Sequence, residues 1–392
     1  MEAELSRLTK DDPVAWHGYD MNPIVVARSK IVLTMLEMWD YPLNRILQIW
    51  FSTCISTEAA RTLSSVCQML SSVEKEKEMR ILFDYWSTAS IPVEQSIQAW
   101  NVGRRESSFT IIPMILTKRD RLDYARYILK GQIFLGGSKD LTGNPTFLPP
   151  RYLFVGSFLP PTNESIYCTF SEDPNSASSL LASIEKRFLD NIANLRELIK
   201  ENHIKITLSV ATISDDNQAV LGEIKGLNPA AIEWSNIPDY LTFEEFFSVV
   251  RKCSGQGTKH SFHLMNWTYK IFGANLVDYV SIDENYRSKN FKLEGFFKDS
   301  SGALPKLLKE LTTELLSRAR HQNRSATTRD LAAVATLMNP LDLSSAALSF
   351  RFYETYMNFM FENIQPTKKE WKRSELAVFD HLYSTVYASF EF

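Results

Sequence analysis

The junction between a strand and a helix near the start of the chain, from Gly18 to Arg28, constrains the fold more than any other feature. The residues from Val14 to Asp20 read as a short strand, and the dipeptide Asn22-Pro23 follows directly. Asparagine is a preferred N-cap and proline is favoured at the first helical position, so we expect a helix that runs to about residue 38. A strand, an acidic turn residue and a helix in this order are typical of one half of a nucleotide-binding α/β unit.

A second α/β stretch begins near residue 178. The expected elements are, in order, a helix over about 178–199, strands over 204–210 and 230–234, a helix from about 243, and a strand over 259–267. Apolar residues recur every three or four positions in the first helix and alternate with polar ones in the strand that follows it. Thr242 with Glu245 forms a capping box for the second helix. This order predicts the later half of a parallel sheet, whose ligands bind beyond the carboxyl ends of the strands.

Helical patterns dominate two other regions, at about 40–130 and after residue 281. In the first region we expect helices over about 44–55 and 93–100, and between them a helix that begins after an N-cap at Ser56 or Thr57. In the second we expect helices over 306–320, 331–338, 346–363 and 369–386. We therefore predict an α/β domain over residues 1–280 with a helical insertion at about 40–130. A helical C-terminal region over residues 281–392 follows it.

Charge and hydropathy restrict the partners of the chain. Among the 392 residues, 43 Lys and Arg face 46 Asp and Glu, so the formal net charge is −3. The positive field that nucleic-acid binding requires is missing, and we expect no nucleic-acid partner. No apolar run approaches the roughly 18 residues of a membrane span, and the first residues do not resemble a signal peptide. We expect a cytoplasmic protein with no membrane partner.

The cysteines and histidines do not suggest a metal. Cys54, Cys67, Cys168 and Cys253 include no C-x-x-C pair, which argues against a zinc ribbon and against a disulfide framework. His260 and His263 follow Cys253, but residues three apart on a strand point to opposite faces. We therefore expect the cysteines to be buried thiols and the chain to hold no metal.

Several of these motifs occur together in one known family. The segments Asp20-Met21-Asn22-Pro23 with Ala27-Arg28, and Ser235-Asn236 with Asp239, resemble a domain of unknown function. That domain lies at the front of dynein axonemal assembly factor three and of fungal proteins that often carry a MYND zinc finger. The resemblance covers about residues 14–270 at low identity. The family resembles S-adenosylmethionine-dependent methyltransferases in fold, so the resemblance implies a Rossmann-like, methyltransferase-type sheet.

The same resemblance implies a cofactor site. Asp20 and Asn22 would lie where the ribose of S-adenosylmethionine binds, and Ser235, Asn236 and Asp239 would face the cofactor or the substrate. Each residue also has a simpler explanation, because Asp and Asn commonly cap helices and form turns before proline.

The chain departs from the family pattern in two ways. Family members usually start with a strand and a glycine-containing turn of the type G-x-G-D-x-R. Here thirteen residues precede Val14 and none of them is glycine, so we expect a sheet without its first strand. The MYND finger is also absent.

Two functions follow from these observations. The first is a non-catalytic, methyltransferase-like protein that binds protein partners, as an assembly factor does. Without the glycine turn, the backbone cannot closely approach the methionine end of the cofactor. The second is an active S-adenosylmethionine-dependent methyltransferase, which needs mainly to position an activated donor against a small-molecule or protein acceptor.

Overall fold

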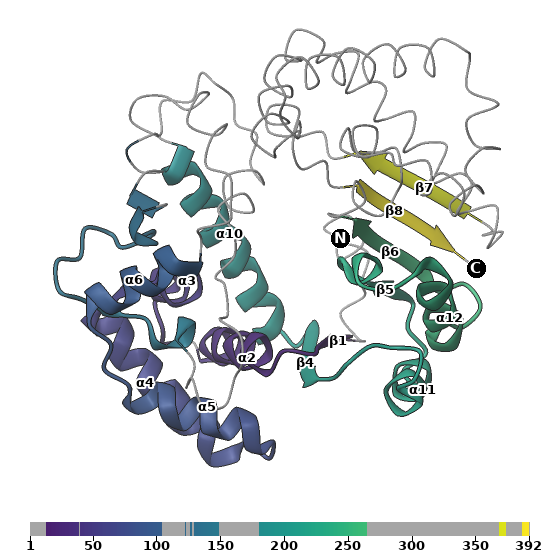
Figure 1. Cartoon of the computed structure of the whole chain (residues 1–392), viewed down its shortest axis with the longest axis horizontal. Coiled ribbons are helices and arrows are strands. Elements are labelled where there is room, and N and C mark those ends of the chain that lie inside the picture. The colour runs from purple at the N-terminus through teal and green to yellow at the C-terminus, as the bar shows by residue number, and fades with distance from the viewer. Residues whose placement is uncertain are drawn as a thin grey trace, which may run out of the picture. The chain divides into compact units, whose positions relative to one another are not determined.

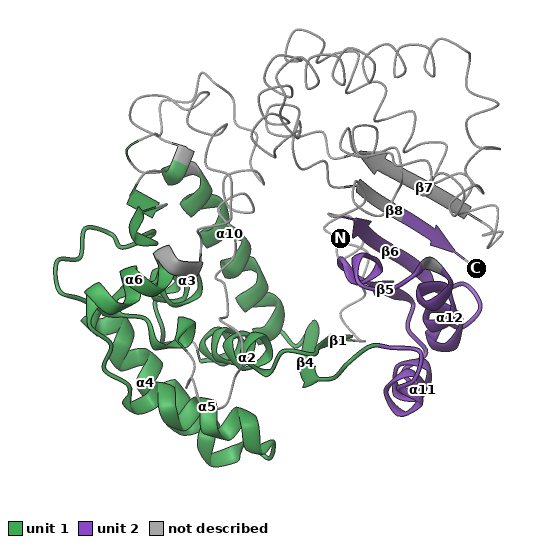
Figure 2. Cartoon of the chain, viewed as in Figure 1, with its two compact units in different colours: residues 1–213 green, residues 214–392 purple. Residues whose placement is uncertain are grey.

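The structure, a computed structural model, describes residues 13–38, 40–103, 122, 126–127, 129–148, 180–264, 368–373 and 386–391. It is a mixed α/β structure with small sheets (Figure 1). The chain divides into two compact units, residues 1–213 and 214–392 (Figure 2). The domain boundary expected at residue 280 lies outside the described residues.

The first unit contains a two-stranded parallel sheet. β1 (Val14–Asp20) pairs with β4 (Ile204–Val210) over its whole length, in the register that sets Val14 opposite Ile204 and Asp20 opposite Val210. Between these strands in sequence lie α2 (Pro23–Glu37) and, directly before β4, α10 (Leu180–Lys200). All four elements were predicted from the sequence within two residues at each end, because their periodicity and caps are local.

The rest of the first unit is mainly helical. It consists of α3 (Leu43–Phe51), β2 (Cys54–Ser56), α4 (Thr57–Val73), α5 (Lys77–Thr88), α6 (Val93–Gly103), β3 (Leu141–Gly143) and the short 3₁₀ helix η1 (Pro145–Phe147). The core lies between these helices and α2. Its largest fully buried side chains include Trp86, Phe83, Ile31, Met35 and Ile46.

The helix expected over 44–55 ends earlier than predicted. α3 stops at Phe51, and Cys54–Ser56 instead pairs antiparallel with β3. The Thr53 N–H donates to the Gly131 carbonyl at 2.9 Å, and the Asn144 N–H donates to the Thr53 carbonyl at 2.7 Å. These distant partners satisfy the backbone at Thr53, so tertiary pairing replaces the last helical turn.

The second unit contains a four-stranded sheet in the order β5–β6–β8–β7 (Figure 1). Its elements are α11 (Gln218–Gly226), β5 (Ala231–Glu233), the 3₁₀ helix η2 (Ile237–Asp239), α12 (Phe243–Cys253), β6 (Lys259–Leu264), β7 (Lys368–Arg373) and β8 (Val386–Glu391). β5 and β6 are parallel, whereas β8 runs antiparallel to both β6 and β7. α12 begins at the predicted capping box of Thr242 and Glu245.

The prediction of a helix over 369–386 was wrong. Lys368–Arg373 and Val386–Glu391 form strands, and β8 pairs with β6 from Leu264 back to Lys259. Apolar residues alternate at Val386, Ala388 and Phe390, which suits a strand. Pairing with a strand more than a hundred residues away overrode the local helical pattern. The other helices expected after residue 281 lie outside the described residues.

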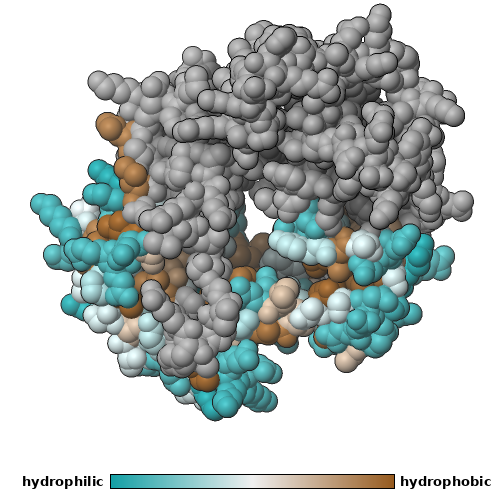
Figure 3. Space-filling model, in the orientation of Figure 1, coloured by the Kyte–Doolittle hydropathy of each residue, from teal (hydrophilic) through white to brown (hydrophobic). Residues whose placement is uncertain are grey.

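Among the described helices, none is long and apolar enough to cross a membrane. On the described surface in Figure 3, hydrophobic residues are scattered among hydrophilic ones. Large exposed apolar side chains of the first unit include Trp16, Met21, Val73 and Val210.

Candidate functional site

The turn after β1 holds the first pair of predicted site residues. The Asp20 carboxylate accepts a hydrogen bond from the Asn22 N–H at 2.7 Å, and the Asn22 side chain accepts one from the Ile24 N–H at 2.9 Å. Asn22 is therefore the N-cap of α2, with Pro23 at the first helical position. The Asp20 carbonyl accepts from the Ala211 N–H at 2.9 Å, which ties this turn to the end of β4.

Asp20 is a partly buried carboxylate. Burial raises its pKa, and the hydrogen bond from the Asn22 N–H opposes that change. One carboxylate oxygen thus shapes the turn. The geometry explains the Asp-x-Asn-Pro motif as a local turn and cap, and it is also compatible with a second oxygen that binds a hydroxyl group.

The turn after β5 holds the other predicted site residues, in the second unit. Ser235 has a left-handed backbone with φ of 52°, and its carbonyl accepts from the His263 N–H at 2.9 Å. The Asn236 side chain donates to the Tyr240 hydroxyl at 3.4 Å. Asp239 ends the 3₁₀ helix η2 and is only 7% exposed. The backbone of this turn is held by the neighbouring strand β6.

Three further polar side chains surround this second turn. Glu233, the last residue of β5, accepts from the Ser235 N–H at 3.2 Å and from the Ser261 hydroxyl. Its other close neighbour is His263, whose Nδ1 lies 4.0 Å from a Glu233 carboxylate oxygen. Ser261 and His263 are two residues apart on β6 and therefore share one face of the strand. Glu233 is the last residue of β5, and His263 is the second-last residue of the parallel strand β6.

His263 is the titratable centre of this cluster. Burial lowers its pKa, while the nearby carboxylates of Glu233 and Asp239 raise it. Because burial is the larger influence, the imidazole is neutral at pH 7 and can accept a proton. A histidine close to a carboxylate can take part in acid–base chemistry, and the same arrangement also occurs in structural ion-pair networks.

His260 lies on the opposite face of β6 and has a structural role. The Trp234 indole N–H donates to its Nδ1 at 3.0 Å, and its Nε2 lies 2.9 Å from the Ser254 hydroxyl. The ring stacks on Phe390 of β8 at 4.9 Å between centroids. Burial lowers the pKa of His260 to about 4, and the side chain is 1% exposed. The prediction that His260 and His263 point to opposite faces is confirmed.

The structure thus brings the predicted residues together as two groups. Asp20 and Asn22 lie in the first unit, and Ser235, Asn236 and Asp239 lie in the second. Sequence reasoning missed Glu233 and His263 as neighbours of the second group. The parallel pairing of β5 with β6 could have indicated them, because both residues lie at or near the carboxyl ends of these strands, where α/β sheets bind their ligands.

The described residues include no metal-binding cluster, that is, no group of three or more His, Cys, Asp or Glu side chains that could hold a metal ion. Cys54, Cys67 and Cys253 are free and buried. Burial raises the pKa of the Cys253 thiol to about 11 and also raises the pKa of Cys54, which makes these thiols unreactive.

Comparison of the chain with family models, with curated proteins and with solved structures gave no match.

Proposed function

We propose that this chain is a methyltransferase-like protein that works by binding another protein, and that one face of the β1–β4 sheet is the binding surface. The observation that carries the proposal is that no residue of either strand is buried, although one face of the sheet is apolar. We call this surface the apolar sheet face; it consists of Val14, Trp16, Gly18, Ile204, Ile206, Leu208 and Val210, with Asp20 at its end.

Register and exposure define this face. Residues opposite each other in a parallel pair project to the same side, as Trp16 and Ile206 do. A Cβ atom on Gly18 would lie 2.8 Å from the Leu208 side chain, which agrees with that register. Trp16 is 52% exposed and Val210 38%. Apolar surface of this kind favours association, because contact with a partner removes it from water.

A partner that adds a strand suits this surface. Within the described residues, β1 forms a sheet with β4 alone. Two-stranded sheets are marginally stable in isolation, and the edge of a strand can pair with an extended segment of another chain. We therefore propose a partner segment that pairs along β1 and presents apolar side chains to the face that carries Trp16.

The strand order within each unit supports the methyltransferase-like fold. In a doubly wound sheet of order 3-2-1-4-5-6, the second and third strands are parallel neighbours, as are the fourth and fifth. β1 with β4 agrees with the former pair, and β5 with β6 agrees with the latter. An antiparallel strand near the edge, such as β8, is common in such sheets.

The alternative function is an active S-adenosylmethionine-dependent methyltransferase. The observation that favours it is the cluster of Glu233, Asp239 and His263 at the carboxyl ends of β5 and β6, where α/β sheets bind their ligands. In that function Asp20 and Asn22 bind the cofactor ribose, and Ser235 with Asn236 shapes the acceptor pocket.

Photo-cross-linking tests the protein-binding proposal. A photoreactive residue is introduced at Trp16 or at Met21, which is 70% exposed, in cells that naturally express the protein. We expect a discrete adduct of higher mass from both positions. The control is Val73 on α4, which is 68% exposed and outside the face, and it should give none. A cross-link to another segment of the same chain, in place of a partner, would contradict the proposal.

Calorimetric titration with S-adenosylmethionine separates the two functions. The protein-binding proposal expects no binding by the folded wild-type chain. Micromolar binding that is lost in Asp20→Ala would instead establish the methyltransferase. Asp20→Asn is the matched control, because its amide oxygen still accepts from the Asn22 N–H and preserves the turn.

A further inference from the structure

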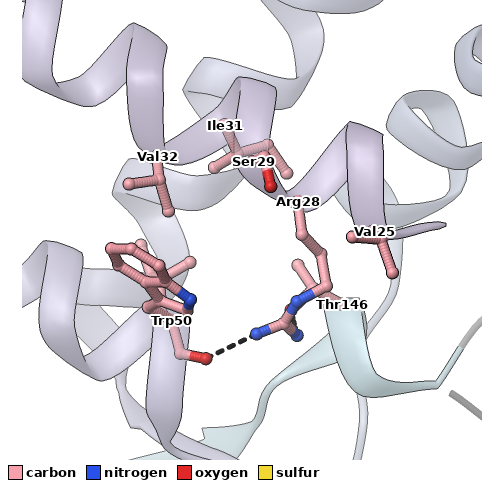
Figure 4. Close-up of a pocket in the computed structure, with 8 residues that line it drawn as sticks. Val25, Arg28, Ser29, Ile31, Val32, Trp50 and Thr146 are labelled. Carbon is pink, nitrogen blue, oxygen red and sulfur yellow. Dashed lines mark hydrogen bonds between the residues drawn. The ribbon is translucent and has the colours of Figure 1, made fainter. Parts of the chain in front are cut away.

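A pocket of about 280 Å³ lies between α2 and α3 in the first unit (Figure 4). Most of its lining residues are aliphatic or aromatic, namely Val25, Ile31, Val32, Ile49 and Trp50, and the others are Arg28, Ser29 and Thr146. An apolar cavity of about 150 Å³ is large enough to hold benzene. The pocket therefore has room for one aromatic ring with a short substituent.

The polar wall of this pocket is held by bonds within the protein. The Arg28 guanidinium donates to the Thr146 hydroxyl at 2.6 Å and to the Trp50 carbonyl at 2.5 Å. The Thr146 hydroxyl donates in turn to the side-chain oxygen of the fully buried Asn144 at 2.8 Å. These bonds join α2 to the end of α3 and to η1, so the shape of the pocket is fixed before a ligand enters.

Two uncharged polar groups face the space inside the pocket. Figure 4 shows the Ser29 hydroxyl and the indole nitrogen of Trp50 turned toward it. Within the described part of the chain, neither of these two side-chain groups makes a hydrogen bond. The pocket thus offers a ligand one N–H donor and one hydroxyl group.

Both groups are accessible, and the indole is held in place. Ser29 is exposed and Trp50 is 37% exposed, so a ligand reaches them directly from solvent. The Trp50 ring stacks on Phe51, with 5.2 Å between the ring centroids and 13° between the planes. This stacking fixes the direction of the indole N–H and makes it a defined donor.

We propose that this pocket binds a small uncharged aromatic molecule whose oxygen atom accepts a hydrogen bond from the Trp50 indole N–H and whose ring lies between Val25 and Val32. Small-molecule sites combine apolar walls with a few polar groups that orient the ligand, as here. An uncharged oxygen matches the two neutral groups, whereas a charged group would lose its hydration among apolar walls. The site shares no residue with the apolar sheet face, so its test does not depend on the proposed partner.

Ligand-observed saturation-transfer NMR on the full chain tests this proposal, with acetophenone as the probe and ethylbenzene as its analogue without an acceptor. We expect both to bind. Trp50→Phe keeps an aromatic ring beside Phe51 and removes the N–H, so acetophenone affinity should fall about fivefold, whereas ethylbenzene affinity should change less than about twofold. No transfer to acetophenone, or an equal loss for both probes, would overturn the proposal. Tighter binding of benzoate than of acetophenone would overturn the assignment to an uncharged ligand.

A second variant and a matched control locate the binding. Ser29→Leu fills the pocket from an exposed helix position and should weaken both probes roughly tenfold or more, because the leucine side chain occupies their space. Ser65→Leu makes the same change at an exposed serine of α4 outside the pocket and should leave both affinities unchanged. Circular dichroism checks that each variant is folded. Unchanged acetophenone affinity in the folded Ser29→Leu variant would place the ligand elsewhere and contradict the proposal.

Discussion

The turn after β1 and the turn after β5 both contain aspartate, asparagine and proline, but different partners hold their backbones. In the first, Asp20 and Asn22 accept from N–H groups two residues away. In the second, Ser235 bonds to His263, which is 28 residues later. The side-chain caps of the first turn are thus local, although its Asp20 carbonyl also accepts from the distant Ala211 N–H, whereas the second turn needs the neighbouring strand β6 in addition to the local bond from the Ser235 N–H to Glu233. The comparison predicts which substitutions should lower the free energy of unfolding through each turn.

The largest effect should come from His260, which supports the second turn because it accepts a hydrogen bond from the indole of Trp234, the residue before Ser235. His260→Ala leaves the Trp234 indole N–H without its acceptor and opens a cavity beside Phe390. We expect the free energy of unfolding to fall by roughly 3 kcal/mol, measured by urea denaturation with circular dichroism. The control His203→Ala removes a more exposed histidine paired with Glu201 and should cost below about 1 kcal/mol. Equal losses in both variants would show that His260 does not support the turn.

Acid should weaken the second unit through the same histidine. The pKa of His260 is lowered from 6.5 to about 4, so the unfolded chain takes up a proton below about pH 6.5 while the folded chain does not until about pH 4. The free energy of unfolding should therefore fall between these values, by up to roughly 3 kcal/mol. His260→Gln, which still accepts from Trp234 and does not titrate, should remove this part of the pH dependence. The measurement is urea denaturation at pH 7 and pH 4.5; the same acid loss in both proteins would refute this origin.

The first turn should depend on its cap. Asn22→Ala removes the acceptor of the Ile24 N–H and should lower the free energy of unfolding by about 1 kcal/mol. Asn22→Asp keeps an acceptor at the same position and should retain most of the stability. Thermal unfolding followed by circular dichroism measures both, and a similar loss in the two variants would mean that the cap is not the cause.

The smallest effect should come from the left-handed backbone of Ser235. Ser235→Gly relieves a conformation that is unfavourable for residues with a Cβ atom, and we expect a gain of about 0.5 kcal/mol. Ser235→Val, with a branched side chain, should be destabilising instead. Opposite signs for the two changes in chemical denaturation would confirm the strain, and a loss in Ser235→Gly would indicate that the serine side chain itself holds the turn.

The sequence predictions were accurate where the deciding interactions join residues close in sequence, and inaccurate where they join distant ones. β1, α2, α10, β4 and the capping box of α12 were predicted closely, because their periodicity and caps depend on residues within four positions. The end of α3 and the two C-terminal strands were not, because distant backbone groups decide them. For the candidate site, the sequence indicated Asp20, Asn22 and Ser235 to Asp239. It did not reveal that Glu233 and His263 lie beside the group in the second unit.

The sequence by itself determined the α/β alternation, the Asp20–Asn22 turn and the starts of α2 and α12. At these positions the backbone N–H groups bond to side chains only two or three residues away. Only the tertiary structure decided that β8 lies between β6 and β7 and that Arg28 is buried against Thr146, 118 residues away. A charged side chain in a helix and a short apolar run are each compatible with several environments. Packing against distant segments selects one, because a buried charge or strand edge is stable only when those segments supply its partners.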